Sequence, residues 1–352
     1  MKKRRHRYAI MPAMKKTNTG MRGAAALAAL CLLAAGAAGA FDSAAWMERR
    51  DDLANEVGRL RDAYGQCAAK ADSPAEDVSL PVETFPNGSV KTSVQAKKAQ
   101  YFLDSGLVWA DGVVVRAFKK DGSADATLEA QGCVVDRLTR SGWADGAVKI
   151  VQGGTTFRGR GVYFSSPEEY VRVTKDSELE SVDFNGKGLE NGKAALPAAL
   201  AAPSSSSAST SSVVRIRSAT SDFDRRAGVV LFDGSTVVEY GDEYTLCADR
   251  VFAFLTASNR LSRVVASGNV VVSNGLRVGT CALATYRRAK GEIEMFGERG
   301  GAKARLVERG ERTGEIDGDR IRFWLAAEEV EVSNSRISAE HDAKAVKDVI
   351  AK

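Results

Sequence analysis

Histidine is almost absent from this chain of 352 residues. Of its two histidines, His6 lies in a basic N-terminal segment and His341 lies close to the C-terminus. The lack of histidine between them argues against Ser-His-Asp and Cys-His catalysis, most zinc sites and a histidine general base. No Walker loop or GxGxxG motif is present either. We therefore predict that the protein is not an enzyme and that it has no catalytic residue, metal site or cofactor.

Cysteine and proline are also scarce. The five cysteines are too few for a disulfide scaffold, and none forms a C-x-x-C motif. Proline is low (7) and glycine is high (33), which is typical of many short strands joined by glycine turns. The sequence therefore favours an all-β fold.

An excess of basic charge is missing from the body of the protein. The net charge of +5 arises in residues 1–40, which hold eight basic residues and no acidic ones. The remainder has 42 basic and 45 acidic residues, a balance of about −3. A nucleic-acid partner has no electrostatic support from this balance, and we predict none.

Residues 1–40 have the pattern of a signal peptide. A basic region ends at Arg22, an apolar run covers Gly23–Ala35, and Ala38-Gly39-Ala40 fits a cleavage site. We predict export to the periplasm, an oxidising compartment. The alternative is an uncleaved inner-membrane anchor formed by residues 23–40. Cleavage is favoured because the apolar stretch is rich in alanine and only about 18 residues long.

A repeat of 34 residues runs through the chain. Gly268 with Val270-Val271 repeats Gly234 with Val237-Val238, and Trp143-Ala144-Asp145-Gly146 repeats Trp109-Ala110-Asp111-Gly112. Within one repeat, Asn274-Gly275 lies between two apolar runs, which is a strong hairpin signal. A fixed period of this size predicts stacked units that bury their apolar faces on one another.

Cys247 and Cys281 occupy equivalent positions of this repeat. We therefore expect their side chains to face the same way. A disulfide between them is feasible if their strands are direct neighbours and is excluded if another strand lies between. The second arrangement is slightly favoured.

The domain organisation follows from composition and periodicity. Leu53, Val57, Leu60 and Tyr64 form one apolar stripe, which predicts a helix over Ser43–Lys70. A helix packed on the first domain is favoured over a short coiled coil. The predicted segments are a signal peptide (1–40), the helix (43–70), a connector (71–87), a first β domain (88–184), an Ala/Pro/Ser linker (185–212), a second β domain (213–338) and a tail (339–352).

Apolar residues recur at period two in the second domain. In a closed barrel they would form a core, and in an open roll they would line a groove for acyl chains, two alternatives that periodicity does not separate. The candidate groove residues are Val229, Leu231, Val237, Phe252, Phe254, Val270, Val272, Phe323 and Leu325.

The first and last strands of the second domain are candidate assembly edges. Val214 and Ile216 lie in the first, within Val213–Arg217, and Val330 and Val332 lie in the last, within Glu328–Ser333. Neither strand contains proline, which often blunts a free edge. We predict head-to-tail strand pairing between copies, or with an outer-membrane partner of the same fold, unless the tail or the linker covers the edges.

The second domain resembles the OstA-like family, the LptA-type periplasmic bridge of lipopolysaccharide export, and the first domain resembles its LptC-type partner. The matching segments of the second domain are Ala219–Asp224, Gly228–Val237, Ala248–Val251, Val265–Val270, Ala282–Tyr286, Glu292–Gly297 and Gly318–Phe323. Those of the first are Ser141–Val148 and Gly161–Ser165. The resemblance implies β-jelly-rolls whose apolar interior carries lipid and whose edge strands join other jelly-rolls. This chain departs from the family pattern by carrying two such units.

The predicted function is therefore periplasmic lipid transport. The chain would carry or bridge lipopolysaccharide, held by its lipid A acyl chains, from the inner to the outer membrane. One alternative is a structural, self-assembling β scaffold without a ligand. A glycan-acting β-solenoid enzyme is the other, because Asp317 and Asp319 lie two apart on one strand. Acids at a turn beside Arg320 are the simpler interpretation of that pair.

Overall fold

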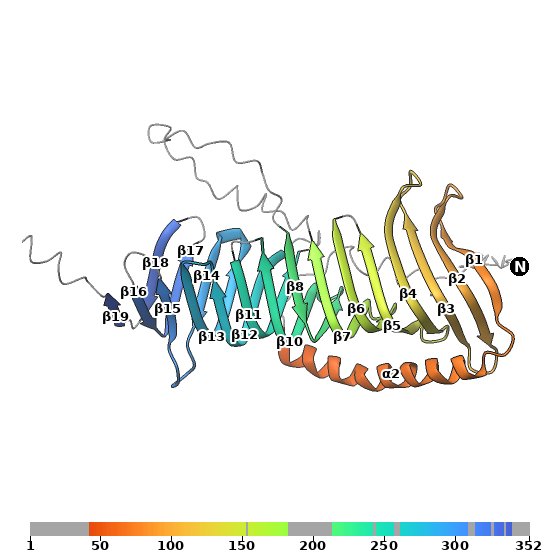
Figure 1. The fold of residues 1–352 in the computed structure, drawn as a ribbon, viewed down its shortest axis with the longest axis horizontal. Coiled ribbons are helices and arrows are strands. Elements are labelled where there is room, and N and C mark those ends of the chain that lie inside the picture. Colours follow the sequence, from red (N-terminus) through yellow and green to blue (C-terminus); the bar gives the residue numbers. More distant parts are fainter. Residues whose placement is uncertain are drawn as a thin grey trace, which may run out of the picture.

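The chain forms a long antiparallel β-sheet folded into two layers, with an α-helix along its outside (Figure 1). The computed structural model describes residues 42–152, 154–181, 213–241, 244–256, 261–308, 314–324, 327–333 and 336–339. The prediction of an all-β fold built from stacked antiparallel strands is confirmed. Apart from helix α2, the described residues contain one short 3-10 turn, Arg288–Lys290.

The elements follow one another in a meander. They are α2 (Ser43–Lys70), β1 (Ala75–Thr84), β2 (Val90–Phe102), β3 (Leu107–Phe118), β4 (Ala124–Asp136), β5 (Ser141–Gln152), β6 (Thr155–Ser165), β7 (Tyr170–Ser181), β8 (Val214–Ser218), β9 (Thr220–Asp224), β10 (Val229–Tyr240), β11 (Tyr244–Leu255), β12 (Leu261–Ser273), β13 (Arg277–Arg287), β14 (Glu292–Phe296), β15 (Ala304–Glu308), β16 (Gly314–Gly318), β17 (Arg320–Trp324), β18 (Ala327–Ser333) and β19 (Arg336–Ala339). From β1 to β7 and from β10 to β13, each strand pairs with the next.

The long strands bend at corners where the backbone has positive φ. Gly112 (φ 61), Gly146 (φ 68), Gly234 (φ 85) and Gly268 (φ 76) lie inside strands β3, β5, β10 and β12. Glycine reaches this region without the penalty that a Cβ carries. The 34-residue repeat is therefore a repeat of corners. The expectation that these glycines separate many short strands is wrong, because each of them bends one long strand.

Each bent strand contributes to both layers. β10 pairs with β9 through Val229–Asp233, on one side of its corner, and with β8 through Val237–Tyr240 on the other. We call the layer that contains β9 the helix-side layer and the layer that contains β8 the opposite layer. At the C-terminal end, β14, β17 and β18 continue the helix-side layer, and β15, β16 and β19 continue the opposite layer.

Helix α2 lies across the outer face of the helix-side layer (Figure 1). Its predicted bounds are confirmed, and the Asp42 carboxylate caps it by accepting from the backbone N–H groups of Ala44 and Ala45. Val57 and Leu60 of the predicted stripe are buried. The helix is not restricted to the first domain, because the ring of Trp46 packs edge-on against Phe252 of β11, with centroids 5.9 Å apart.

Two expectations about domain borders need correction. The predicted connector 71–87 contains strand β1, which pairs with β2 along its length, and Pro81 is tolerated there because β1 has a described partner on one side only. The two β domains share one sheet, since β7 pairs directly with β8 and β9. The predicted linker 185–212 and the tail 340–352 lie outside the described residues.

The corner geometry predicts unequal responses to alanine at two glycines. A Cβ at Gly268 would lie 2.3 Å from Asp249 Oδ2, whereas a Cβ at Gly275, in the β12–β13 hairpin turn, would meet nothing within 4 Å. Both residues have positive φ. We expect Gly268→Ala to lower the free energy of unfolding by about 2–4 kcal/mol and Gly275→Ala by about 1 kcal/mol. Urea unfolding of the two variants measures this, and equal losses would contradict the corner role of Gly268.

Candidate functional site

The space between the two layers is apolar along the whole roll. In the first half of the roll, strands β1–β7, this space is filled by small and branched side chains such as Val115, Leu128 and Ile150, each less than a tenth exposed. In the second half, strands β8–β19, it is filled by residues such as Phe232, Met295 and Ile321. Alternation along strands that face each other across two layers produces such an interior.

The two interior clusters are joined at the middle of the roll. Leu179 of β7 and Phe223 of β9 pack against both of them. The ring of Phe223 lies edge-on to Phe157 of the first half, with centroids 5.2 Å apart, and to Phe232 of the second half, at 6.3 Å. The apolar interior is therefore continuous from one half to the other.

The interior is less tightly closed in the second half. Its cluster is bordered by half-buried apolar side chains, among them Val272, Ile293 and Phe323, and then Val330 and Val332 on β18. Apolar side chains that remain partly exposed at the border of an apolar interior offer contact area to an apolar ligand. This part of the interior is the candidate functional site.

Three of the nine candidate groove residues line this interior, namely Val270, Val272 and Phe323. Four others face the opposite way and pack beneath helix α2: Val229, Leu231, Phe252 and Phe254. Assigning those four to the groove was therefore wrong. Val237 is half-buried and belongs to neither cluster, and Leu325 lies outside the described residues.

The wrong face was chosen because strands β10 and β11 are apolar on both sides. The runs Val229–Phe232 and Val251–Leu255 are continuous rather than alternating. Such runs indicate burial of both faces. Val230 and Phe232 point inward, while their neighbours contact the helix. The unbroken apolar runs, together with the amphipathic helix, were the sequence features from which burial of both faces could have been predicted.

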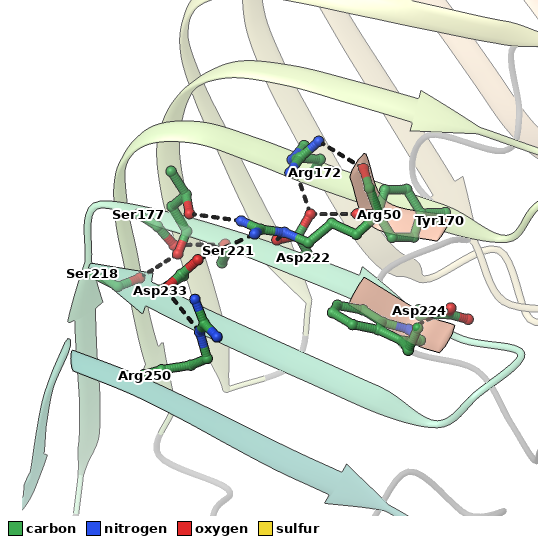
Figure 2. A network of polar contacts seen from close by, with 12 residues as sticks. Arg50, Tyr170, Arg172, Ser177, Ser218, Ser221, Asp222, Asp224, Asp233 and Arg250 are labelled. Carbon is green, nitrogen blue, oxygen red and sulfur yellow. Dashed lines mark hydrogen bonds and ion pairs between the residues drawn. The ribbon is translucent and has the colours of Figure 1, made fainter. Parts of the chain in front are cut away.

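A buried network of charges joins the helix, the first half and the second half (Figure 2). Asp222 of β9 has no exposed surface, and its carboxylate pairs with Arg50 of α2 at 2.8 Å and with Arg172 of β7 at 3.1 Å. The hydroxyl of Tyr170 donates to the same carboxylate. Arg50 also pairs with Asp233 of β10 at 3.2 Å. Three separate segments of the chain thus converge on one carboxylate.

Burial and charge act together on this network. Burial, followed by the negative charge of Asp222, raises the pKa of Tyr170. Burial alone would lower the pKa of Arg50, but the Asp222 and Asp233 carboxylates outweigh it and the pKa is raised. Both groups therefore keep their protons at neutral pH. Asp222 and Asp224 belong to the segment Ala219–Asp224, whose role here is to hold the two halves together.

The two predicted assembly edges have different environments. Strand β8 pairs with β7 on one side and with β10 on the other, so Val214 and Ile216 are buried and do not lie at a free edge. Placing an assembly edge there was wrong, because the first domain occupies it. In contrast, β18 pairs only with β17 among the described strands.

The cysteines of the repeat are separated by a strand. Cys247 pairs with Val271 of β12 and Cys281 pairs with Val270 of the same strand, so β12 lies between them. Both are free thiols, as favoured from the sequence. Because neighbours on β12 point to opposite faces, so do the two cysteines, contrary to expectation. Burial raises the pKa of Cys281 to about 11.

Two further features bear on chemistry. Among residues with a described position, no group of three or more histidine, cysteine or acidic side chains is arranged to hold a metal ion. The described helices include none that is long and apolar enough to cross a membrane. Asp317, one of the paired acids, lies 3.9 Å from the Arg305 guanidinium.

Comparisons with known proteins find similarity among solved structures. No family model and no curated protein matches the chain. A solved structure that matches is that of LptH, the LptA homologous periplasmic component of the conserved lipopolysaccharide transport device from Pseudomonas aeruginosa. It is 14% identical, covers 37% of this chain and 94% of that chain, and has a TM-score of 0.29.

Proposed function

We propose that the protein carries a lipid with acyl chains along the apolar interior of its second half. The observation that carries this proposal is the set of half-buried apolar side chains, such as Val272 and Phe323, that border the interior between the layers. The first half has fewer half-buried apolar side chains at the border of its interior, among them Val94 and Val135. Partial exposure leaves a surface on which acyl chains gain hydrophobic contact.

The proposed cargo is lipopolysaccharide, moved between the inner and outer membranes. The resemblance of residues 213–338 to the OstA-like family supports this cargo, and the signal-peptide pattern of residues 1–40 supports a periplasmic location. In this proposal the first half serves as a base to which the lipid-carrying half is fixed by Arg50 and Asp222.

Strand β18 is the proposed joining edge. Its Val330 and Val332 side chains border the candidate site, so a partner strand added there would extend the same apolar surface. The opposite end of the roll is less suited to pairing, because β1 contains Pro81 and a positive φ at Asp77. This asymmetry favours a different protein of the same fold over a second copy as the partner.

Photo-crosslinking in cells tests the cargo. A photoreactive residue at Val272 or Phe323 should capture lipopolysaccharide, because both side chains border the interior. Phe252 is the matched control, since it lies in the same half but packs beneath helix α2, and should capture none. Capture at all three positions, or at none, would contradict lipid carriage along the interior. Absence of lipid in a chain that still assembles would favour the scaffold alternative. That alternative is supported by the edge of β18, which has no second partner among the described strands.

A further inference from the structure

Two leucines at neighbouring hairpin turns are strongly exposed. Leu138, in the β4–β5 turn, is 84% exposed, and Leu103, in the β2–β3 turn, is 81% exposed. Tyr101, beside Leu103, is 44% exposed. Turns normally carry small or polar residues, so two bare leucines at their tips need an explanation other than folding.

The two turns form a single protrusion. The backbone N–H of Arg137 donates to the carbonyl oxygen of Gly106 at 3.3 Å, which ties one turn to the other. The Leu138 side chain lies beside Gly106, 3.6 Å from where a Cβ would be. The Arg137 guanidinium lies over the Tyr101 ring, 5.3 Å from its centroid. We call Tyr101, Leu103, Arg137, Leu138 and Arg140 the leucine tip.

The next turns along the same rim are built differently. In the β6–β7 turn, Glu168 pairs with Arg49 and Arg226, and Glu169 pairs with Arg225. Those turns have the charged surface expected of a rim in water. Along this rim, the exposed apolar residues are therefore concentrated near the end of the roll that holds β2–β5.

Charge around the leucine tip is mainly positive. Arg137 and Arg140 are exposed in the same turn. The carboxylate of Asp136, next to them, is buried and paired with Arg59 at 2.8 Å, so its charge is already compensated. Asp104 is the one exposed acid in the two turns. The tip thus combines apolar side chains, an aromatic ring and a net positive charge.

We propose that the leucine tip inserts into the surface of a membrane that contains anionic phospholipids. Leucine side chains on a protruding turn can enter the acyl region, while tyrosine is favoured at the headgroup level. Arg137 and Arg140 then lie at the depth of the lipid phosphates, where anionic lipids attract basic side chains. The proposal concerns the outer surface and does not depend on what the interior carries.

The leucine tip is remote from the proposed joining strand. The two turns lie on the rim next to helix α2 at the end with β2–β5, whereas β18 lies at the other end (Figure 1). A roll that rests on a membrane by the leucine tip therefore leaves β18 clear of that contact and accessible to a partner strand.

Hydrogen exchange of the full chain tests the tip directly. The probe is a vesicle of phosphatidylethanolamine and phosphatidylglycerol, compared with a vesicle of phosphatidylcholine. We expect the amides of residues 102–106 and 137–140 to exchange about tenfold more slowly with the anionic vesicles than with the neutral ones, since the attraction of Arg137 and Arg140 to an anionic surface accounts for a factor of this size. Reading these turns separately keeps the result independent of any membrane binding by residues 1–40.

Matched variants make the test specific. Leu103→Asp with Leu138→Asp should abolish the protection, and both residues are too exposed for their loss to unfold the roll. Leu276→Asp is the control, because Leu276 is 64% exposed at the β12–β13 turn beside Arg277, and should leave the protection unchanged. Unprotected turns, equal protection by neutral vesicles, or protection that survives the double variant would overturn the proposal. So would a photoreactive residue at Leu138 that captures a protein in place of phospholipid.

Discussion

Asp222→Asn should lower the free energy of unfolding by about 3–5 kcal/mol, because it removes a fully buried carboxylate that two half-buried arginines share. Arg50 and Arg172 both pair with Asp222, whose side chain has no exposed surface. Asparagine has nearly the same shape as aspartate and keeps the packing. The loss in free energy of unfolding therefore measures the contribution of the negative charge. Chemical denaturation followed by circular dichroism measures the change.

A surface pair supplies the control for this prediction. Arg217 and Glu239 lie 2.6 Å apart on the opposite layer, but their side chains are 55% and 33% exposed. Removing that charge with Glu239→Gln should cost less than about 1 kcal/mol, because water screens an exposed pair. Similar losses for the two variants would mean that the buried network does not join the halves.

A double-mutant cycle shows whether the helix belongs to the same unit. Arg50→Ala removes the helix's contribution to Asp222 and Asp233. Combined with Asp222→Asn, it should cost clearly less than the two single losses together, because both changes break one interaction. Additive losses would place Arg50 and Asp222 in separate interactions. Two unfolding transitions in the Asp222→Asn variant would show that the network couples the halves.

Local periodicity was sufficient to predict the helix. The stripe containing Val57 and Leu60 repeats at helical spacing, and both residues are buried in the structure. Its surroundings could not be predicted in the same way. Contacts between Trp46 and Phe252, or Arg50 and Asp222, join residues more than 150 positions apart, and nothing in a local pattern specifies them.

The 34-residue repeat predicted stacked units but not the role of the glycines within them. Gly268 and Gly275 both have positive φ, yet the first bends a strand and the second closes a hairpin. A local glycine signal is compatible with both outcomes, because either needs the same backbone freedom. The difference lies in the chain that follows, which continues along the same neighbours after Gly268 and reverses after Gly275.

Only part of the candidate site was predicted from the sequence, because a local pattern does not fix the surroundings of a strand. Alternation correctly separates the two faces of a strand but does not say which face is inside. Val270, Val272 and Phe323 were assigned to the correct face. For Phe252 and Phe254 the assignment failed, since helix α2 gives the outer face of the helix-side layer an apolar cover of its own.

Val332→Pro should abolish joining through strand β18 while leaving the roll folded. The carbonyl oxygen of Ser333 accepts from the N–H of Asp319, next to β17, so the backbone groups of Ser333 face the roll. Successive residues of a strand direct their backbone groups to opposite sides, so the N–H of Val332 faces the free edge. Proline there removes a donor needed by an added strand and none used by β17.

In-cell crosslinking from Glu331, which is exposed on the same strand, measures this joining. The chain with Val332→Pro should lose its protein adduct, and Val332→Ala, which keeps the N–H, should retain it. Glu331→Pro, tested by circular dichroism in the purified chain, should instead loosen the end of the roll, because the N–H of Glu331 faces β17. Size-exclusion chromatography with light scattering on the purified chain then distinguishes the two kinds of partner. The chain should associate if the partner is a second copy, and it should be monomeric if the partner is a different protein. If Val332→Pro retained the adduct of the unmodified chain, the joining edge would have to be sought elsewhere on the roll.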